Sequence, residues 1–300
     1  MTQLPGQQDV RVLDQQPALA GLYARAVLRR PGRRPAEELS GTVLSLVDQR
    51  TDRDRLYRYQ QVCGFRVSDV LPATFGHLLG FNLSIELMTQ PDFPFPLLGL
   101  IHVENSITQV RPVDAAEVTS VRVWASGLRD HSAGRQVDLN TEVAVDGERV
   151  WYERSTYLRR GKRPAEPRPE RPAEHRPERR PESSRDREPV SAIVAVPADT
   201  GRSYAAVSGD RNPIHLHNLP AKAFGFPSAI AHGMWLAGRS LAYFEGRLPD
   251  AFTFDARFKT PVFLPSRVVL DAATTETGWA VQVSGAASGR PHLTASITQR

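Results

Sequence analysis

The chain has 300 residues, of which 40% are hydrophobic and 24% are charged, a composition typical of a globular protein with one or two domains. Its net charge of +5 and its pI of 9.6 raise the question of nucleic-acid binding. The only cysteine, Cys63, excludes an intramolecular disulfide framework and a cysteine-based zinc finger, and we expect it to be a small buried hydrophobe.

Two further absences in the sequence narrow the class of protein. No run reaches the ~18–20 apolar residues that a membrane span needs. Residues 1–12 are polar and lack the apolar stretch of a signal peptide. We therefore expect a cytoplasmic protein without a membrane span.

The pattern of the first half of the chain predicts one helix followed by a series of strands. Residues 72–88 (PATFGHLLGFNLSIELM) are apolar on most sides and predict a buried helix. Strand-like segments follow at 97–113, 118–125, 136–145 and 148–158, the last one after a turn at Asp146-Gly147. A buried helix followed by consecutive strands is an α+β pattern, in which a curved antiparallel sheet wraps the helix.

Residues 160–189 form a proline-rich segment that separates two folded units. These thirty residues contain seven prolines, ten Lys+Arg and seven Asp+Glu, so they carry +3 of the net charge of +5. They contain no large aliphatic or aromatic side chain that could bury a core or stack on bases. We interpret this segment as a disordered, solvated linker between residues 1–159 and 190–300, and we expect no nucleic-acid partner.

The second half repeats the pattern of the first. Residues 233–246 predict a second buried helix, and strand-like segments follow at 252–262, 268–273, 279–284 and 292–298. The repetition predicts two copies of one small α+β module.

The residues best suited to chemistry are concentrated in 204–234 (YAAVSGDRNPIHLHNLPAKAFGFPSAIAHGM). Ser208-Gly209-Asp210 and Asn212-Pro213 are turn-forming sequences, so we expect Asp210 and His215 on an irregular segment that brings carboxylate and imidazole together. Asp210 with His215 and His217 also resembles a set of metal ligands, which is the alternative interpretation of this segment.

The order of these residues resembles the hydratase motif of the MaoC-like family, which contains (R)-specific enoyl-CoA hydratases and 3-hydroxyacyl dehydratases. The matching positions are Tyr204, Ser208-Gly209-Asp210, Asn212-Pro213, His215, Ala223, Gly225-Phe226 and Ile230-Ala231-His232-Gly233-Met234. The stretch 93–113 is similar to actinobacterial 3-hydroxyacyl-thioester dehydratases. The resemblance implies an α+β double hot-dog fold, with a degenerate first hot dog at 1–159 and a catalytic second one at 190–300.

The resemblance also implies a role for each residue of the motif. Asp210 and His215 would form the catalytic dyad that activates water and transfers protons, which an imidazole suits at neutral pH. The backbone N–H of Gly233, at the start of the helix, would bind the thioester oxygen. Ser208, Asn212 and His232 would support the dyad, and the group that protonates Cα is left open.

Other parts of the chain have less specific expectations. Arg257 and Lys259 alternate around Phe258, so we expect them on one strand face, where they are candidates to bind coenzyme A phosphates or are simply solvated. The first half lacks the motif, which predicts one active site per chain and an interior devoted to the acyl tail.

These observations favour a lyase that hydrates trans-2-enoyl thioesters reversibly to (R)-3-hydroxyacyl thioesters, without a metal or redox cofactor. A hot-dog acyl-CoA thioesterase and a non-catalytic acyl-thioester binding protein are the alternatives. The substrate carrier is coenzyme A or acyl carrier protein, and the expected assembly is a monomer or a homodimer.

Overall fold

A computed structural model describes residues 9–28, 38–161 and 190–300. The predicted linker at 160–189 lies outside the described residues from position 162 onward. Before it, the elements are β1 (Asp9–Val12), α1 (Leu19–Leu28), β2 (Thr42–Gln49), α2 (Arg53–Cys63), the 3₁₀ turn η1 (Ala73–Phe75), α3 (Gly76–Thr89), β3 (Leu100–Gln109), β4 (Thr119–His131), β5 (Gly134–Val145) and β6 (Glu148–Arg160).

The elements after residue 189 form the second half of the structure. They are β7 (Val190–Val196), α4 (Thr200–Ser208), α5 (Pro213–Leu216), α6 (Asn218–Ala223), α7 (Gly233–Ala242), β8 (Phe252–Phe258), β9 (Ser266–Thr275), β10 (Gly278–Gly285) and β11 (Pro291–Gln299). None of the helices in the described ranges is long and apolar enough to cross a membrane.

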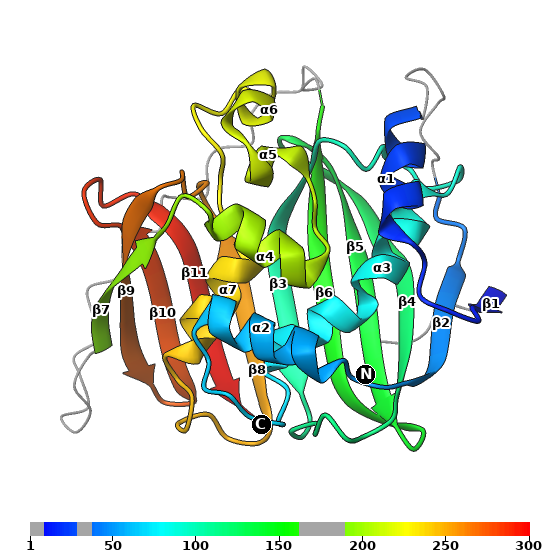
Figure 1. Ribbon diagram of the computed structural model, residues 1–300, viewed down its shortest axis with the longest axis horizontal. Helices are drawn as coiled ribbons and strands as arrows, with labels where there is room; N and C mark the ends of the chain where they lie inside the picture. The colour runs from blue at the N-terminus through cyan, green and yellow to red at the C-terminus, as the bar shows by residue number, and fades with distance from the viewer. Residues whose placement is uncertain (1–8, 29–37, 162–189) are drawn as a thin grey trace.

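All described strands belong to one sheet, with helices across one of its faces (Figure 1). The strand order is β1-β2-β4-β5-β6-β3-β8-β11-β10-β9-β7, so the first six strands come from the first half and the last five from the second. The halves meet where β3 pairs antiparallel with β8, for example at Ile107 opposite Phe254. Only the pairing of β1 with β2 is parallel among these strands.

The two central helices explain why the sheet curves around them. In α3 ten of fourteen residues are buried, and in α7 seven of ten are buried. A helix that is apolar on most sides must be buried on most sides. The strands of each half bury one of the two helices. The fold is a double hot dog of the α+β class, as the sequence predicts.

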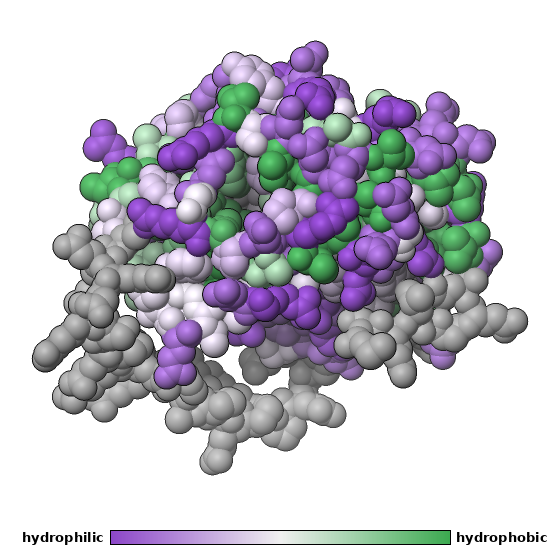
Figure 2. All heavy atoms as spheres, turned by 90° about the horizontal axis from the view of Figure 1, so that it is seen from below, coloured by the Kyte–Doolittle hydropathy of each residue, from purple (hydrophilic) through white to green (hydrophobic). Residues whose placement is uncertain are grey.

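The surface at the lower end of Figure 1 is mixed in character. On the face turned toward the viewer in Figure 2, hydrophilic and hydrophobic side chains are interspersed over short distances. The predicted limits of the first unit (1–159) and of the linker (160–189) stay predictions.

Candidate active site

A cavity of ≈ 270 Å³ lies between the two halves, and both halves line it. From the first half come Tyr23, His77, Phe81, Ile85, Met88, Leu97, Leu98, Leu100, Ile101, His102, Tyr157 and Arg160. From the second half come the motif residues Tyr204, Ser208, Asp210, Asn212, His215, His232 and Gly233, together with Phe258, Lys259 and their neighbours. The cavity therefore has a polar end at the motif and an apolar part along α3 and the start of β3.

The local sequence determines where Asp210 and His215 lie. Helix α4 ends at Ser208 because Gly209 adopts the left-handed conformation (φ 84°). Asn212 then caps α5 by accepting a hydrogen bond from the backbone N–H of Ile214, with Pro213 in the first helical position. Asp210 is thus on an irregular segment as predicted, but the prediction for His215 was wrong, because it belongs to the short helix α5.

Asp210 is held as a carboxylate by several donors. Its Oδ1 accepts hydrogen bonds from the backbone N–H of Asn212 (3.1 Å) and from the hydroxyl of Tyr23 (3.3 Å). Burial opposes the charge, but the imidazoles of His232 and His215 and the N–H of Asn212 outweigh it and lower the pKa of Asp210. The carboxylate is therefore ionised at neutral pH.

His215 has a fixed tautomer. Its Nδ1–H donates to the backbone carbonyl oxygen of Ile230 at 2.8 Å, so Nε2 carries the lone pair. Burial lowers the pKa of His215, with Asp210 acting in the opposite direction. The ring is therefore neutral at neutral pH and presents a base at Nε2.

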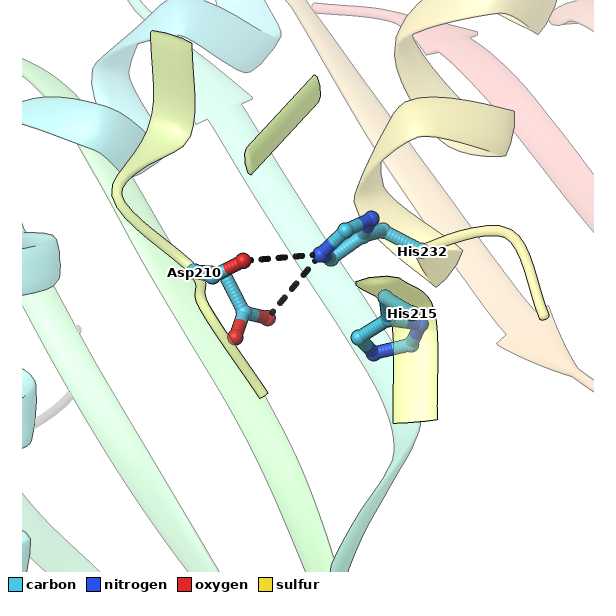
Figure 3. A group of neighbouring side chains, drawn as sticks. All are labelled: Asp210, His215 and His232. Carbon is cyan, nitrogen blue, oxygen red and sulfur yellow. Dashed lines mark hydrogen bonds and ion pairs between the residues drawn. The ribbon is translucent and has the colours of Figure 1, made fainter. Parts of the chain in front are cut away.

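His232, the residue before the start of α7, contacts both Asp210 and His215. Its Nε2–H donates to the backbone carbonyl oxygen of Asp210 (3.0 Å) and lies 3.8 Å from Oδ2 (Figure 3). Its ring stacks on that of His215, with centroids 3.7 Å apart and planes at 26°. Burial, with a further contribution from His215, lowers the pKa of His232 to about 3. His232 is thus a neutral spacer that fixes the separation of the dyad.

The separation of the three groups suits one water molecule. A carboxylate oxygen of Asp210 and one ring nitrogen each of His215 and His232 lie within 4.8 Å of one another. A water that donates two hydrogen bonds of normal length spans acceptors about 4.5 Å apart. A metal ion is the other occupant that such a set accepts, with His232 in place of the His217 considered from the sequence. Coordination by His232 Nε2 would break its hydrogen bond with Asp210.

The start of α7 provides free backbone donors beside this set. The helix begins at Gly233, after His232 in extended conformation, and its first N–H groups have no partner within the helix. A Cβ atom on Gly233 would come within 3.0 Å of the ring of Phe258. Glycine therefore allows the helix start to pack against the cavity wall.

The two predicted coenzyme A contacts, Arg257 and Lys259, have different surroundings in the structure. Strand β8 ends at Phe258, and the backbone N–H of Lys259 still donates to the carbonyl oxygen of His292 (2.9 Å). Lys259 lines the cavity, whereas Arg257 is exposed and forms an ion pair with Glu104 (3.4 Å).

Three residues of the first half reach this site, and two of them, Tyr23 and Arg55, have no signal in the sequence that identifies them. Tyr23 of α1 contacts Asp210, and Arg55 of α2 donates to the backbone carbonyls of Val207 (2.7 Å) and Ser208 (3.2 Å). His77 lines the cavity and had a recognisable signal, because it is the only titratable residue in the first turns of a mostly apolar helix.

Comparisons with known proteins agree with this architecture. A family model described as MaoC like domain matches residues 169–289. The chain is 36% identical over 263 residues to 3-hydroxyacyl-thioester dehydratase X of Mycobacterium tuberculosis, covering 87% of this chain and 90% of the relative. The crystal structure of HtdX of M. tuberculosis superposes with a TM-score of 0.74 at 36% identity, covering 86% of this chain and 100% of that one.

A more distant structure shares the fold alone. The MaoC-like dehydratase of Phytophthora capsici matches with a TM-score of 0.67 at 18% identity, over 86% of this chain and 94% of that one. The strand order and the two wrapped helices define the class of double hot-dog proteins. With a relative of 36% identity over nearly all of its length, the chain belongs to the MaoC-like family.

Proposed function

We propose that this protein catalyses the reversible hydration of trans-2-enoyl thioesters to (R)-3-hydroxyacyl thioesters, and is thus a hydro-lyase. The observation that carries the proposal is the pairing of an ionised Asp210 with a neutral His215, whose Nδ1–H is already engaged, in the wall of one cavity. The 3-hydroxyacyl-thioester dehydratase named above, at 36% identity, supports the same reaction.

The protonation states account for activation of water. Asp210 and the Nε2 atom of His215 are both acceptors, so a water between them donates both of its protons and keeps its oxygen lone pairs free. The oxygen forms the bond to Cβ of the enoyl thioester. One of the dyad groups takes a proton from the water, and a proton is returned to Cα on the same face, so the product contains the whole water molecule.

The helix start accounts for stabilisation of the thioester. As water adds to Cβ, negative charge moves to the thioester oxygen. The N–H of Gly233 at the positive end of α7 is a donor for that oxygen. The elimination of water from the 3-hydroxyacyl thioester uses the same contacts in reverse.

We infer that the acyl tail runs along α3. His77, Phe81, Ile85 and Met88 follow one face of this helix and line the cavity. The eleven residue-to-residue steps from His77 to Met88 cover about 16 Å, which is close to the length of an extended chain of about a dozen carbons. The interior of the first half would then serve substrate binding, as expected from its lack of the motif.

The proposal also covers the carrier of the acyl group and the oligomeric state of the protein. Lys259 and Arg160 line the cavity with basic groups, which suits the phosphates of coenzyme A or of a phosphopantetheine carried by acyl carrier protein. Lys259 is a better candidate than Arg257, because Glu104 pairs with Arg257. We propose that the dyad works without a metal or redox cofactor. A monomer or homodimer and a cytoplasmic location stay predictions.

The test is the loss of the enoyl absorbance of crotonyl- and dodecenoyl-CoA. Asp210→Asn and His215→Gln should each lower kcat by at least about 100-fold. Asp255→Asn and the exposed His217→Gln are matched controls that should keep wild-type rates. Equal rates in all five proteins would refute the dyad. Release of free thiol would instead indicate a thioesterase, and tight binding without turnover a binding protein.

A further inference from the structure

A buried histidine–glutamate pair lies at the cavity on the side that the first half provides, where His77 is a lining residue and Glu153 lies behind it. Nδ1 of His77 lies 2.9 and 3.0 Å from the two carboxylate oxygens of Glu153. Both side chains are buried, and Asn105 donates a further hydrogen bond to Glu153 at 2.6 Å. The pair belongs to the half of the chain that lacks the hydratase motif.

A gain in stability does not explain why an ion pair is buried at this place. Removing two charges from water costs about as much as their attraction returns, and a well-packed apolar pair often stabilises a fold as well. The neighbours on the same face of α3, such as Phe81 and Ile85, are apolar. An apolar pair at 77 and 153 would suit an acyl tunnel, so the charges indicate an interaction with the substrate.

The geometry directs His77 toward the reacting end of the cavity. Because Glu153 engages Nδ1, the other ring nitrogen, Nε2, is left for the cavity that His77 lines. The ring lies 6.2 Å from that of His102, which lies 5.0 Å from Phe258, the residue packed on Gly233. His77 and the proposed donor Gly233 are thus connected through His102 and Phe258, and all four residues line the cavity.

A neighbouring orphan atom points to the same part of the cavity. Nε2 of His102 is buried and has no hydrogen-bond partner in the described part of the chain. Buried polar atoms of this kind are normally satisfied, by a ligand or by ordered water. The wall between His77 and Phe258 therefore carries more hydrogen-bonding capacity than the protein itself uses.

We propose that His77 is a further catalytic residue, which donates a hydrogen bond from Nε2 to the oxygen of the substrate thioester, and that Glu153 is its positioning residue. The proposal rests on the hydratase function proposed above. No proton leaves His77 in the reaction, because water supplies both the hydroxyl at Cβ and the hydrogen at Cα. The imidazolium stabilises the charge that develops on the oxygen during this addition.

The protonation of His77 gives the proposal a distinct pH signature. Burial lowers the pKa of His77, but the charge and hydrogen bond of Glu153, with a smaller effect of Asp210, reverse this and raise it above its ordinary value. The other titratable groups around it are His102 of β3, whose pKa burial lowers to about 4, and Tyr157 of β6, whose pKa burial raises. Neither is charged at neutral pH.

Activity then requires neutral His215 and cationic His77, which predicts a bell-shaped dependence of kcat on pH. The alkaline limb belongs to His77. Glu153→Gln removes the charge that holds the proton on His77, so the alkaline limb should move to lower pH while the acidic limb stays in place.

The experiment compares wild type, Glu153→Gln, the double variant His77→Gln/Glu153→Gln and the exposed control His131→Gln. The double variant keeps two side chains that can hydrogen-bond and leaves no buried charge unpaired. We expect Glu153→Gln to lower kcat about 10-fold near the alkaline limb, and the double variant to lower it about 10- to 100-fold at every pH. KM should change less than threefold, and His131→Gln should match wild type.

Two outcomes would overturn the role of His77. One is a folded double variant with wild-type kcat and an unchanged pH profile, which would make the pair structural. The other is an unchanged kcat with a raised KM, which would assign the pair to ground-state binding. If wild type itself hydrates neither crotonyl- nor dodecenoyl-CoA, the hydratase function fails and His77 loses its catalytic role with it, a result that differs from failure of the variants alone.

Discussion

The hydroxyl of Tyr23 lies 3.3 Å from Oδ1 of Asp210, although the two residues are 187 positions apart in the chain. The same hydroxyl accepts a hydrogen bond from the backbone N–H of Arg211 at 3.2 Å. Burial, and then the charge of Asp210, raise the pKa of Tyr23, so the phenol stays protonated and donates. A residue of α1 in the first half therefore fixes the carboxylate of the second half.

Tyr23→Phe should test this link with little change of shape. A hydrogen bond to a charged group contributes about 1.5–3 kcal/mol, so we expect kcat to fall about 10-fold and the midpoint of thermal unfolding to change by only a few degrees. Tyr57→Phe removes an exposed hydroxyl bonded to Gln61 and is the matched control. Steady-state hydration of crotonyl-CoA measures the effect, and a wild-type kcat for Tyr23→Phe would show that Asp210 needs no such support.

The sequence predicts the two central helices and eight of the eleven described strands, for a physical reason, whereas β1, β2 and β7 were not predicted. Segments 72–88 and 233–246 are apolar on most sides, and such helices need a sheet around them. Helix α7 starts at Gly233 as predicted and ends at Ala242, four residues earlier than expected. Helices α1, α2 and α4 were not predicted, because each buries only part of its surface and has a weaker pattern.

The residues of the site also divide into those that a local sequence pattern predicts and those that it does not. Asp210, His215 and Gly233 lie within thirty residues, so local turn chemistry and the ordered motif are enough to group them. Tyr23 and Arg55 reach the site only through the packing of α1 and α2 against the second half, which no local pattern encodes. Glu153 has a signal in the sequence, because it is a charged residue among the buried, inward-facing positions of β6.

Arg55 should matter for the position of the catalytic segment. It donates to the carbonyls of Val207 and Ser208 at the end of α4, one turn before Asp210. Arg55→Met keeps the aliphatic stem but leaves both carbonyls without this partner, so we expect the free energy of unfolding to drop by about 1–3 kcal/mol and kcat to fall several-fold. Arg58→Met, on the exposed side of α2, is the control, and urea titration with crotonyl-CoA turnover distinguishes the two.

The proposed course of the acyl tail predicts a change in chain-length preference. Leu97 is half-buried in the loop before β3 and lines the cavity. Leu97→Trp should fill the far end of the cavity, so kcat/KM for dodecenoyl-CoA should fall at least about 10-fold, while crotonyl-CoA keeps its rate. Val67→Trp, at an exposed site, should affect neither substrate. An equal loss for both substrates would place the tail elsewhere.

Stability should decrease in mild acid because of the buried neutral histidines. Burial lowers the pKa of His102 to about 4, whereas an unfolded histidine titrates near ~6.5. Between these values the unfolded chain binds more protons, so stability falls as pH falls, by up to about 1.4 kcal/mol per pH unit for each such group. His232 behaves in the same way, with its pKa at about 3.

His102→Phe isolates one of these groups. The aromatic neighbours Tyr157 and Phe258 provide an apolar environment for the new ring, so stability at pH 7 should be nearly unchanged. Urea titrations from pH 7 to pH 4.5 should show a shallower loss of stability than in wild type. The same slope in both proteins would mean that His102 is protonated in the folded state.

Gly201 offers the most local test of how α4 positions the dyad. It is the second residue of α4, and a Cβ atom there would overlap the backbone carbonyl of His215. Because the obstacle is backbone, Gly201→Ala must displace either α4 or α5, and α5 carries the proposed base. We expect kcat to fall at least about 100-fold, with a loss of about 1–3 kcal/mol in stability.

The control for this change is Gly21→Ala in the first turn of α1, where an added Cβ meets no atom within 4 Å. There alanine should stabilise the helix by up to about 1 kcal/mol and leave kcat unchanged. If Gly201→Ala lost stability but kept its kcat, α4 would have moved and α5 would not. The hydrogen bond from His215 Nδ1 to Ile230 would then hold the base in place without help from α4.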